Sequence, residues 1–392
     1  MHLLEQYALS SGLKIGKPFI YQVFFPIESE RYICFHPNSK FDSKNYDYWQ
    51  LVIDLIHPIL KKNGIDIVQI GAAGEKGYSN CIQTQGQASI NQSSYIIRNS
   101  ILSLGADSFS AHVASGFGKK IVSIYSNNNI NNCKPYWSDK EDVILLEPER
   151  FGEKPNYSAK ESPKTINRIK PEIIANHVLK LLNIDETVKI ETLFIGENFN
   201  GETNFGFLPN QIVVSEKIPE LRMDLFPEEK HLSAQLSRQR TIITTNRPIS
   251  QETLLKFKAN VAKVIYLIDE NDKPEFVKFL FENGFAFDCV SKLPPDRISS
   301  KKINYYRYCA INEHLESEQE KQFKTKLKSI LKGDNLKFRT NYIICSDRKN
   351  YLSEQHLLDN EQVDDVNGFY NLKDTDLFLS DLKNAWVIKE LY

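Results

Sequence analysis

The sequence predicts an α/β protein made of two Rossmann-type, doubly wound domains, and three observations support that prediction. Short apolar runs alternate with amphipathic stretches along most of the chain, as strands and helices do in such folds. Polar or glycine-rich turns follow several of the apolar runs, where open α/β sheets bind their ligands. The 392 residues leave room for two domains of ordinary size.

Composition and charge narrow the class of protein. The chain is 41% hydrophobic and carries a formal net charge of −1, so no global charge attracts it to nucleic acid or anionic lipid. Its six cysteines form no C-x-x-C pair, which argues against zinc and against a disulfide framework and favours a reducing cytoplasm. Residues 1–30 lack a cationic start followed by a long apolar run, so neither a signal peptide nor a membrane span is expected there.

The most informative segment is a predicted strand, turn, helix and second strand between residues 101 and 125. An apolar strand precedes Asp107 and Ser108, either of which can cap the helix that follows, and Gly118 is placed to end that helix. Free N–H groups and the dipole at the start of the helix favour a phosphate or diphosphate. Capped helices are common in α/β proteins, however, and His112 is equally compatible with a core position.

Two earlier turns have the same character. The predicted strand from Arg31 ends in the turn His36–Ser39, with Lys44 shortly after it and an amphipathic helix over Tyr48–Leu60. The strand Ile65–Ile70 runs into a glycine-rich turn that contains Gly74 and Glu75. Because the carboxyl ends of parallel strands meet at one edge of a sheet, these turns are expected to form one ligand site.

Taken in order, residues 31–183 resemble the donor-binding half of the ADP-heptose:lipopolysaccharide heptosyltransferases, which are family nine glycosyltransferases of the GT-B fold. The matching blocks are His36-Pro37-Asn38-Ser39 with Lys44 and Trp49, Val68–Glu75, Gly86–Ile90, Asp107–Ala114 and Ile169–Ile173. The resemblance implies a GT-B-like protein. In the family, a Rossmann-type acceptor domain precedes this half, whereas here only about thirty residues do.

These considerations predict a permuted domain order. We expect a linker-like segment at 1–30, a nucleotide-sugar (donor) domain at 31–187, and a second α/β domain on the acceptor side, with a helical tail, at 188–392. Strands are predicted in the second domain at 191–196, 211–215, 241–245, 262–269 and 285–290, with helices between them. A departure from the family pattern is Phe109, which stands where the family has a small glycine and would crowd a diphosphate.

By resemblance, the protein is a metal-independent, inverting glycosyltransferase that moves a sugar from a nucleotide-diphosphate donor to an acceptor hydroxyl. The implied substrate-binding residues are Ser39, Lys44, Gly74, Glu75, Asp107, Ser108 and His112. Lys44 would place a point charge on the diphosphate, Glu75 would accept hydrogen bonds from the nucleoside, and Asp107 would lie near the donor sugar. If no ligand binds, Lys44 can be interpreted as a surface lysine and Asp107 as a helix cap.

The acceptor side is less defined. A general base is expected from the second domain, with Glu197 and Asp224 as candidates that match no family motif. The acceptor would be a glycan, a lipid-linked saccharide or another hydroxyl compound, and the enzyme would be cytoplasmic or peripheral at the inner face of the membrane. No cofactor, metal or nucleic-acid partner is expected.

Two alternative functions remain open from the sequence. One is a binding or scaffold protein that keeps the frame without turnover, which Phe109 and the undefined base would suit. The other is a nucleotide-sugar epimerase, which shares the two-lobed fold and needs no acceptor. Near the carboxyl terminus, a helix is predicted over Ser317–Leu331, and the acidic residues from 359 to 365 are interpreted as solvated carboxylates rather than metal ligands.

Overall fold

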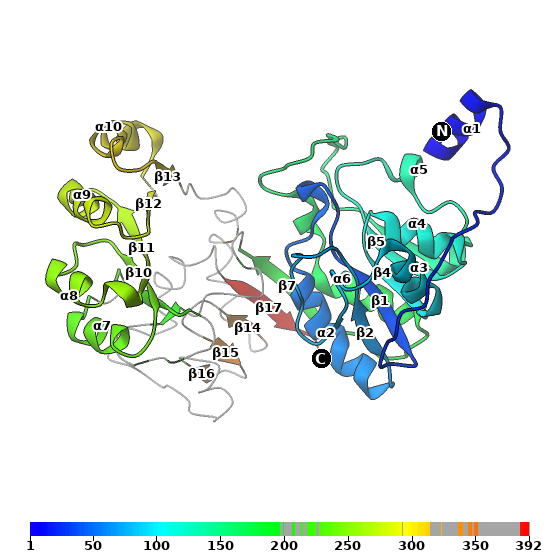
Figure 1. Ribbon diagram of the computed structural model, residues 1–392, viewed down its shortest axis with the longest axis horizontal. Coiled ribbons are helices and arrows are strands. Elements are labelled where there is room, and N and C mark those ends of the chain that lie inside the picture. The colour runs from blue at the N-terminus through cyan, green and yellow to red at the C-terminus, as the bar shows by residue number, and fades with distance from the viewer. Residues whose placement is uncertain are drawn as a thin grey trace. The chain divides into compact units, whose positions relative to one another are not determined.

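The computed structural model describes residues 1–196, 199, 206–207, 212, 214, 218–224, 227–291, 293–313, 323, 336–339, 344–346, 349–351 and 385–391. The chain divides into two compact units (Figure 1). The first comprises Met1–Thr192 with Leu391–Tyr392, and the second comprises Leu193–Glu390. The assignment of the two units to donor and acceptor stays a prediction.

The first unit contains a six-stranded parallel sheet in the order β3-β2-β1-β4-β5-β6. Its strands are β1 (Tyr32–His36), β2 (Asp66–Gln69), β3 (Ile82–Gln83), β4 (Leu102–Ala106), β5 (Lys120–Ile124) and β6 (Val143–Leu146). The chain moves outward from β1 to β3 and then returns to place β4 on the other side of β1. This is the doubly wound order, and its direction reverses between β1 and β4, where such sheets bind ligands.

Helices cover both faces of this sheet (Figure 1). They are α2 (Trp49–Lys62), α3 (Ile90–Asn99), α4 (Phe109–Gly116) and α6 (Pro171–Leu181). Helix α2 packs against α6, and α3 packs against α4. The buried positions of α2 include Trp49, Val52, Ile56 and Leu60, a spacing that places them on one side of the helix. Helix α3 begins at a capping box between Ser89 and Gln92, as its sequence permits.

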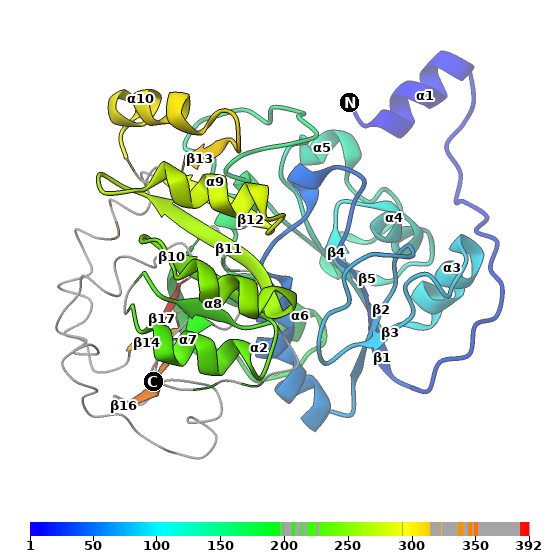
Figure 2. The same ribbon diagram turned by 60° about the vertical axis from the view of Figure 1, so that its left-hand side comes forward.

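The amino-terminal segment lies along the first unit, and its linker-like role stays a prediction. It contains α1 (Leu3–Ser11) and a long extended stretch (Figure 2). The N–H of Val23 donates to the carbonyl of Asn91 at 3.1 Å, and the indole of Trp137 donates to the carbonyl of Gly16 at 3.0 Å. Ile20 packs so closely over Gly116 of α4 that a Cβ on this glycine would lie 2.4 Å from its Cδ1 atom.

Short elements complete the first unit. They are α5 (Ile130–Cys133) and the 3₁₀ turns η1 (Asp42–Lys44), η2 (Lys140–Asp142) and η3 (Thr165–Arg168). Turn η1 follows β1 and carries Lys44, while η3 lies just before α6. Both turns take part in the site described below.

The second unit also has a six-stranded parallel sheet, as expected, but its strands lie in chain order from β8 to β13. They are β8 (Gly206–Phe207), β9 (Glu220–Arg222), β10 (Thr241–Thr245), β11 (Val261–Ile268), β12 (Phe287–Ser291) and β13 (Ile311–Glu313). The direction of winding never reverses among these strands. The doubly wound order therefore belongs to the first sheet, and the second sheet is singly wound.

Single winding places the connecting helices of the second unit on one face of its sheet (Figure 1). They are α7 (Glu229–Leu236), α8 (Gln251–Lys256), α9 (Pro274–Glu282) and α10 (Pro295–Tyr305), with the 3₁₀ turn η4 (Lys258–Asn260) after α8. Ile243, Val264 and Leu280 belong to the core that these helices form with the sheet.

A third sheet has the order β16-β15-β14-β17-β7 and was not anticipated. It consists of β7 (Ile190–Ile195), β14 (Leu336–Arg339), β15 (Ile344–Ser346), β16 (Lys349–Tyr351) and β17 (Trp386–Glu390). Strands β14 to β17 pair in an antiparallel manner. The helix predicted over 317–331 and the acidic residues from 359 to 365 lie outside the described residues, apart from Phe323. Within the described part, no helix combines the length and the apolar run needed to cross a bilayer.

Candidate functional site

A buried ion pair joins the carboxyl ends of β1 and β4. Lys44 Nζ lies 2.6 Å from Asp107 Oδ2, and the two side chains are only 11% and 5% exposed. The amide of Asn128, beyond β5, donates to the same oxygen at 3.1 Å. Such charge-assisted hydrogen bonds are the strong ones in proteins. Lys44 is therefore no surface lysine, and it lies at the point where the winding of the first sheet reverses.

The pairing modifies the role expected of Lys44. The negative charge of Asp107 balances that of Lys44, so Lys44 is not an isolated positive charge at the position expected for the diphosphate. An ammonium group has three N–H donors, however, and the Asp107 contact uses one of them. Because both groups are buried, removal of either would leave an uncompensated charge inside the unit.

The start of α4 differs in detail from the expected cap. Ser108 occupies the N-cap position with extended backbone, φ −152° and ψ 178°, but its side chain makes no cap hydrogen bond, and Asp107 is engaged by Lys44. The prediction that one of these side chains caps the helix is wrong, because the ion pair holds Asp107 and the Ser108 hydroxyl makes no bond to the first turn. The first N–H groups of an uncapped helix lack side-chain partners and remain available to an anion.

Phe109 is the first residue of α4 and is 37% exposed. Its ring packs edge to face on that of His36, with the centroids 5.0 Å apart. His36 Nδ1 in turn lies 3.0 Å from the hydroxyl of Ser110. Burial lowers the pKa of His36 to about 4, against an opposing contribution from Glu75. His36 is thus a neutral hydrogen-bonding group at pH 7, and sequence reasoning assigned it no role.

The turn after β2 is linked to the turn after β1 through Glu75. The amide of Asn38 donates to Glu75 Oε2 at 3.0 Å. Glu75 folds over Gly71, where a Cβ would lie 2.2 Å from the same oxygen. Gly74 adopts φ +81°, a conformation that favours glycine, and it is exposed. The structure places Gly74 in the turn after β2, and its role in substrate binding stays a prediction.

His112 lies one turn into α4 and is half-buried. Burial lowers its pKa, while the charge of Asp107 acts in the opposite direction and the charges of His2 and Lys44 lower the pKa further. His2 contributes to this part of the unit from the amino terminus: its Nε2 lies 2.9 Å from the carbonyl of Lys134. The sequence contains no signal that would have placed His2 here.

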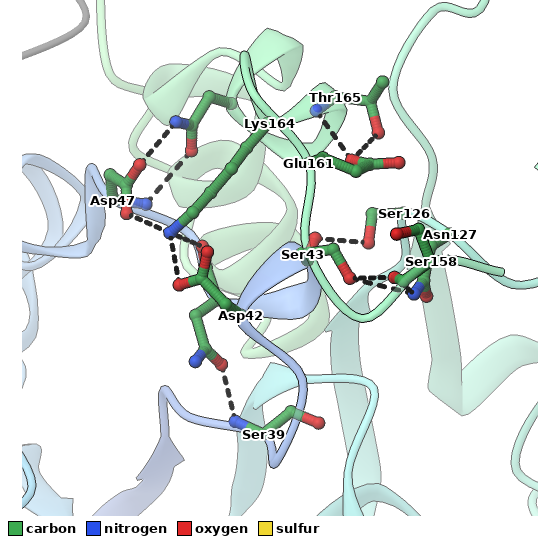
Figure 3. A network of polar contacts seen from close by, with 12 residues as sticks. Ser39, Asp42, Ser43, Asp47, Ser126, Asn127, Ser158, Glu161, Lys164 and Thr165 are labelled. Carbon is green, nitrogen blue, oxygen red and sulfur yellow. Dashed lines mark hydrogen bonds and ion pairs between the residues drawn. The ribbon is translucent and has the colours of Figure 1, made fainter. Parts of the chain in front are cut away.

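A set of polar contacts, which we call the polar frame, holds the turn that carries Lys44 (Figure 3). It comprises Ser39, Asp42, Ser43, Asp47, Ser126, Asn127, Ser158, Glu161, Lys164 and Thr165. Lys164 Nζ lies 3.0 Å from Asp42 and 2.8 Å from Asp47, and these carboxylates outweigh burial and raise the Lys164 pKa. Ser43 donates to the carbonyl of Ser158 at 2.6 Å. The polar frame thereby fastens η1 to the segment before α6.

Ser39 takes part in the polar frame through its backbone. Its N–H donates to Asn45 Oδ1 at 2.7 Å, which closes the turn after β1 (Figure 3). A role for its hydroxyl in phosphate binding stays a prediction. In the described part of the chain, no group of three or more His, Cys, Asp or Glu side chains is arranged to hold a metal ion.

The two proposed general bases have different outcomes. Glu197 lies outside the described residues. Asp224 follows β9 in the second unit, and both its oxygens accept from Arg222: Nε to Oδ1 and Nη2 to Oδ2, each at 2.8 Å. The two side chains are 8% and 6% exposed. This buried two-point ion pair engages both oxygens of Asp224, and a role for Asp224 as general base stays a prediction.

Comparisons with known proteins found similarity to this chain among solved structures. No protein-family model and no curated protein matches it. Among solved structures, it is similar to Escherichia coli ADP-heptose lps heptosyltransferase II, with 16% identity over 46% of this chain and 50% of that one, at a TM-score of 0.32. The family 9 glycosyl transferase of Veillonella parvula matches with 18% identity over 46% and 50%, also at 0.32.

A third similar structure is E. coli heptosyltransferase WaaC with ADP, with 13% identity over 45% of this chain and 54% of that one, at a TM-score of 0.32. These matches span about half of the length of the solved structures. At such identities and TM-scores the likeness does not decide the activity of this chain.

Proposed function

We propose that the first unit binds a nucleoside diphosphate at the carboxyl ends of β1, β2 and β4, and that the protein transfers a sugar from such a donor to an acceptor hydroxyl. One observation carries the proposal. Lys44, Asp107 and the open start of α4 come from turns more than sixty residues apart, and they meet where the winding of the sheet reverses. The ordered sequence blocks noted above supply the expected class of ligand.

The chemistry of glycosyl transfer suits this arrangement. Negative charge collects on the departing diphosphate as the bond to the anomeric carbon breaks, and stabilising that charge lowers the barrier. In our proposal, the first N–H groups of α4 and the two remaining N–H donors of Lys44 bind the diphosphate. Asp107 holds Lys44 in position, and its carboxylate also borders the sugar side of the donor.

Nucleoside recognition is assigned to the turn after β2. Glu75 is oriented by Asn38, which donates to one of its oxygens, so the other oxygen is available to a ribose or base donor. A general base is needed to accept the proton of the acceptor hydroxyl. Because Asp224 is bound at both oxygens by Arg222, Glu197 is the candidate to test first.

A second candidate function is binding without turnover. Two observations favour it: Phe109 stands exposed at the start of α4, and the charge of Lys44 is already balanced by Asp107. A scaffold would bind a nucleoside diphosphate but would release none from a nucleotide sugar. The epimerase alternative predicts conversion of one nucleotide sugar into another with no acceptor present.

The test begins with calorimetry on the full chain with ADP, GDP, UDP and CDP. We expect one of them to bind, and Lys44→Ala to weaken that binding by about 5- to 150-fold, the equivalent of about 1 to 3 kcal/mol for a lost charge-assisted contact. Lys120→Ala is the matched control. Lys120 lies at the amino end of β5, away from the carboxyl ends of the strands, and it donates to the carbonyl of Leu181. Failure of all four nucleotides to bind would overturn the proposal.

Turnover is tested separately, with the matching nucleotide sugars and release of nucleoside diphosphate as the readout. Asp107→Ala should lower turnover more than nucleotide affinity, because its proposed partner is the sugar side of the donor. Binding without release from any donor would support the scaffold instead of the transferase.

A further inference from the structure

Two cysteines of the second unit face each other. Cys309 Sγ lies 3.2 Å from Cys289 Sγ, although the residues are twenty positions apart in the sequence. Cys289 is fully buried and Cys309 is half-buried. The cysteine spacing in the sequence did not indicate this pair, because no short motif joins the two positions. Both thiols are free in the structure.

The fold holds both residues in place. Cys289 is in the middle of β12, and it pairs with Ile311 of the adjacent strand β13. Cys309 lies in the short connection between α10 and β13, and its N–H donates to the carbonyl of Tyr305 at 3.0 Å. A disulfide has an S–S length of about 2.05 Å, so a movement of little more than 1 Å would join the sulfurs.

The pair is also chemically asymmetric. The hydrogen bond with Cys289 lowers the pKa of Cys309, and the same interaction, together with burial, raises the pKa of Cys289. In contrast, burial raises the pKa of Cys34, Cys81 and Cys133. Since the thiolate is the reactive form, Cys309 is the more reactive and the more accessible member of the pair.

We propose that Cys289 and Cys309 are a site of reversible oxidation that forms an intramolecular disulfide in response to a peroxide. The Cys309 thiolate attacks one peroxide oxygen, the O–O bond breaks, and a sulfenic acid forms with release of one water. Cys289 then attacks the Cys309 sulfur, the S–O bond breaks, and a second water leaves. In total, two thiols are oxidised to one disulfide while one hydrogen peroxide is reduced to two waters.

The bond would fasten one edge of the second sheet. It closes the loop from β12 through α10 to the start of β13, so α10 could no longer separate from the sheet. A loop of this size constrains the unfolded chain, and the oxidised protein should therefore melt at a higher temperature. In a reducing compartment the dithiol form prevails, which makes the pair an oxidation sensor and not a permanent cross-link.

The experiment uses the full chain, freed of reductant, exposed to hydrogen peroxide and digested with trypsin without reduction. Lys292 and Arg307 separate the two cysteines, so the disulfide appears as a cross-linked pair of tryptic peptides that dithiothreitol splits. We expect this cross-link in the folded protein, with loss of two titratable thiols. The melting temperature of the second unit should rise by about 5 to 10 °C.

Cys309→Ser should abolish both the cross-link and the rise in melting temperature. Cys81→Ser, which removes another half-buried thiol, should leave both unchanged. Oxidation of Cys309 to the sulfonic acid with no cross-linked peptide would overturn the proposal, as would a cross-link that forms only after the protein has been unfolded in urea.

Discussion

The two parallel sheets have the same number of strands but differ in winding, and their buried ion pairs differ in a corresponding way. In the first sheet the winding reverses between β1 and β4, and charged side chains from separate turns meet there around Lys44 and Asp107. In the second sheet it never reverses. The charged residue after β9, Asp224, pairs with Arg222 from the end of that same strand.

The comparison teaches that a buried ion pair has to be interpreted together with the topology of the sheet that carries it. Lys44–Asp107 and Arg222–Asp224 are similarly buried and similarly short. The first lies beside the open start of a helix, between two strands whose connections diverge. The second joins residues two positions apart, one in β9 and one just after it. Burial and charge alone would not distinguish the pair at the proposed binding site from the pair in the second unit.

The largest expected effect comes from breaking each ion pair in turn. Lys44→Ala and Arg222→Ala should each destabilise their own unit by about 3 to 5 kcal/mol, because each leaves a buried carboxylate without its partner. Only Lys44→Ala should also weaken nucleotide binding. Urea unfolding gives the stabilities and calorimetry the affinities.

A double variant separates folding from binding in this comparison. Lys44→Met combined with Asp107→Leu removes both charges and should recover most of the lost stability, since similar-sized apolar residues often replace a buried pair without loss. It should not recover nucleotide binding. If Arg222→Ala weakened nucleotide binding as much as Lys44→Ala does, the distinction between the two units would be lost.

The next effect concerns the junction between β1 and β4. Gly105 of β4 lies opposite His36, and a Cβ at this position would be 2.1 Å from the His36 carbonyl oxygen. Gly105→Ala should therefore force the strands apart and cost about 3 kcal/mol, the upper part of the range for overpacking, because the obstacle is backbone. Gly16→Ala is the control, since a Cβ added to Gly16 would meet nothing within 4 Å. Equal stabilities of the two variants would contradict the prediction.

The smallest of the three effects is a pH dependence specific to the first unit. His36 takes up a proton near pH 6.5 in the unfolded chain and near pH 4 in the folded one, because burial disfavours the charged form. Between these values the unfolded state binds more protons, so stability is fully present above pH 6.5 and falls as the pH decreases. The loss contributed by His36 should reach about 2 kcal/mol at pH 5.

Urea titrations at pH 7 and pH 5 measure this loss in the wild type and in His36→Gln. The variant should lose less stability on acidification, while His57→Gln on α2 should behave like the wild type. A wild-type stability that rose between pH 7 and pH 5 would have the wrong sign for a buried neutral histidine.

Local signals predicted the elements of the first unit well. The strand, turn and helix around Asp107 follow from apolar runs and turn residues that lie close together in the sequence, and β4, α4 and β5 occupy the expected ranges. The contact of Lys44 with Asp107 depends on how β1 and β4 become neighbours, which no local pattern specifies. The same holds for His2 and Asn128, whose sequence surroundings carry no distinguishing signal.

The second unit shows the other limit of sequence reasoning. The alternation of strands and helices correctly indicated a parallel α/β sheet, but alternation is the same for singly and doubly wound sheets, because only the direction of successive crossovers differs. The third sheet was missed for a related reason: β7 and β17 are neighbours in it although nearly two hundred residues separate them.

The polar frame around η1 has a consequence for the thermodynamics of ligand capture. The turn that carries Lys44 is tied by Lys164 and Ser158 to a segment more than a hundred residues later in the chain. Its conformational entropy is therefore lost when the first unit folds, not when a ligand arrives. A ligand at this edge meets a preorganised partner, and a larger share of its contact energy can appear as affinity.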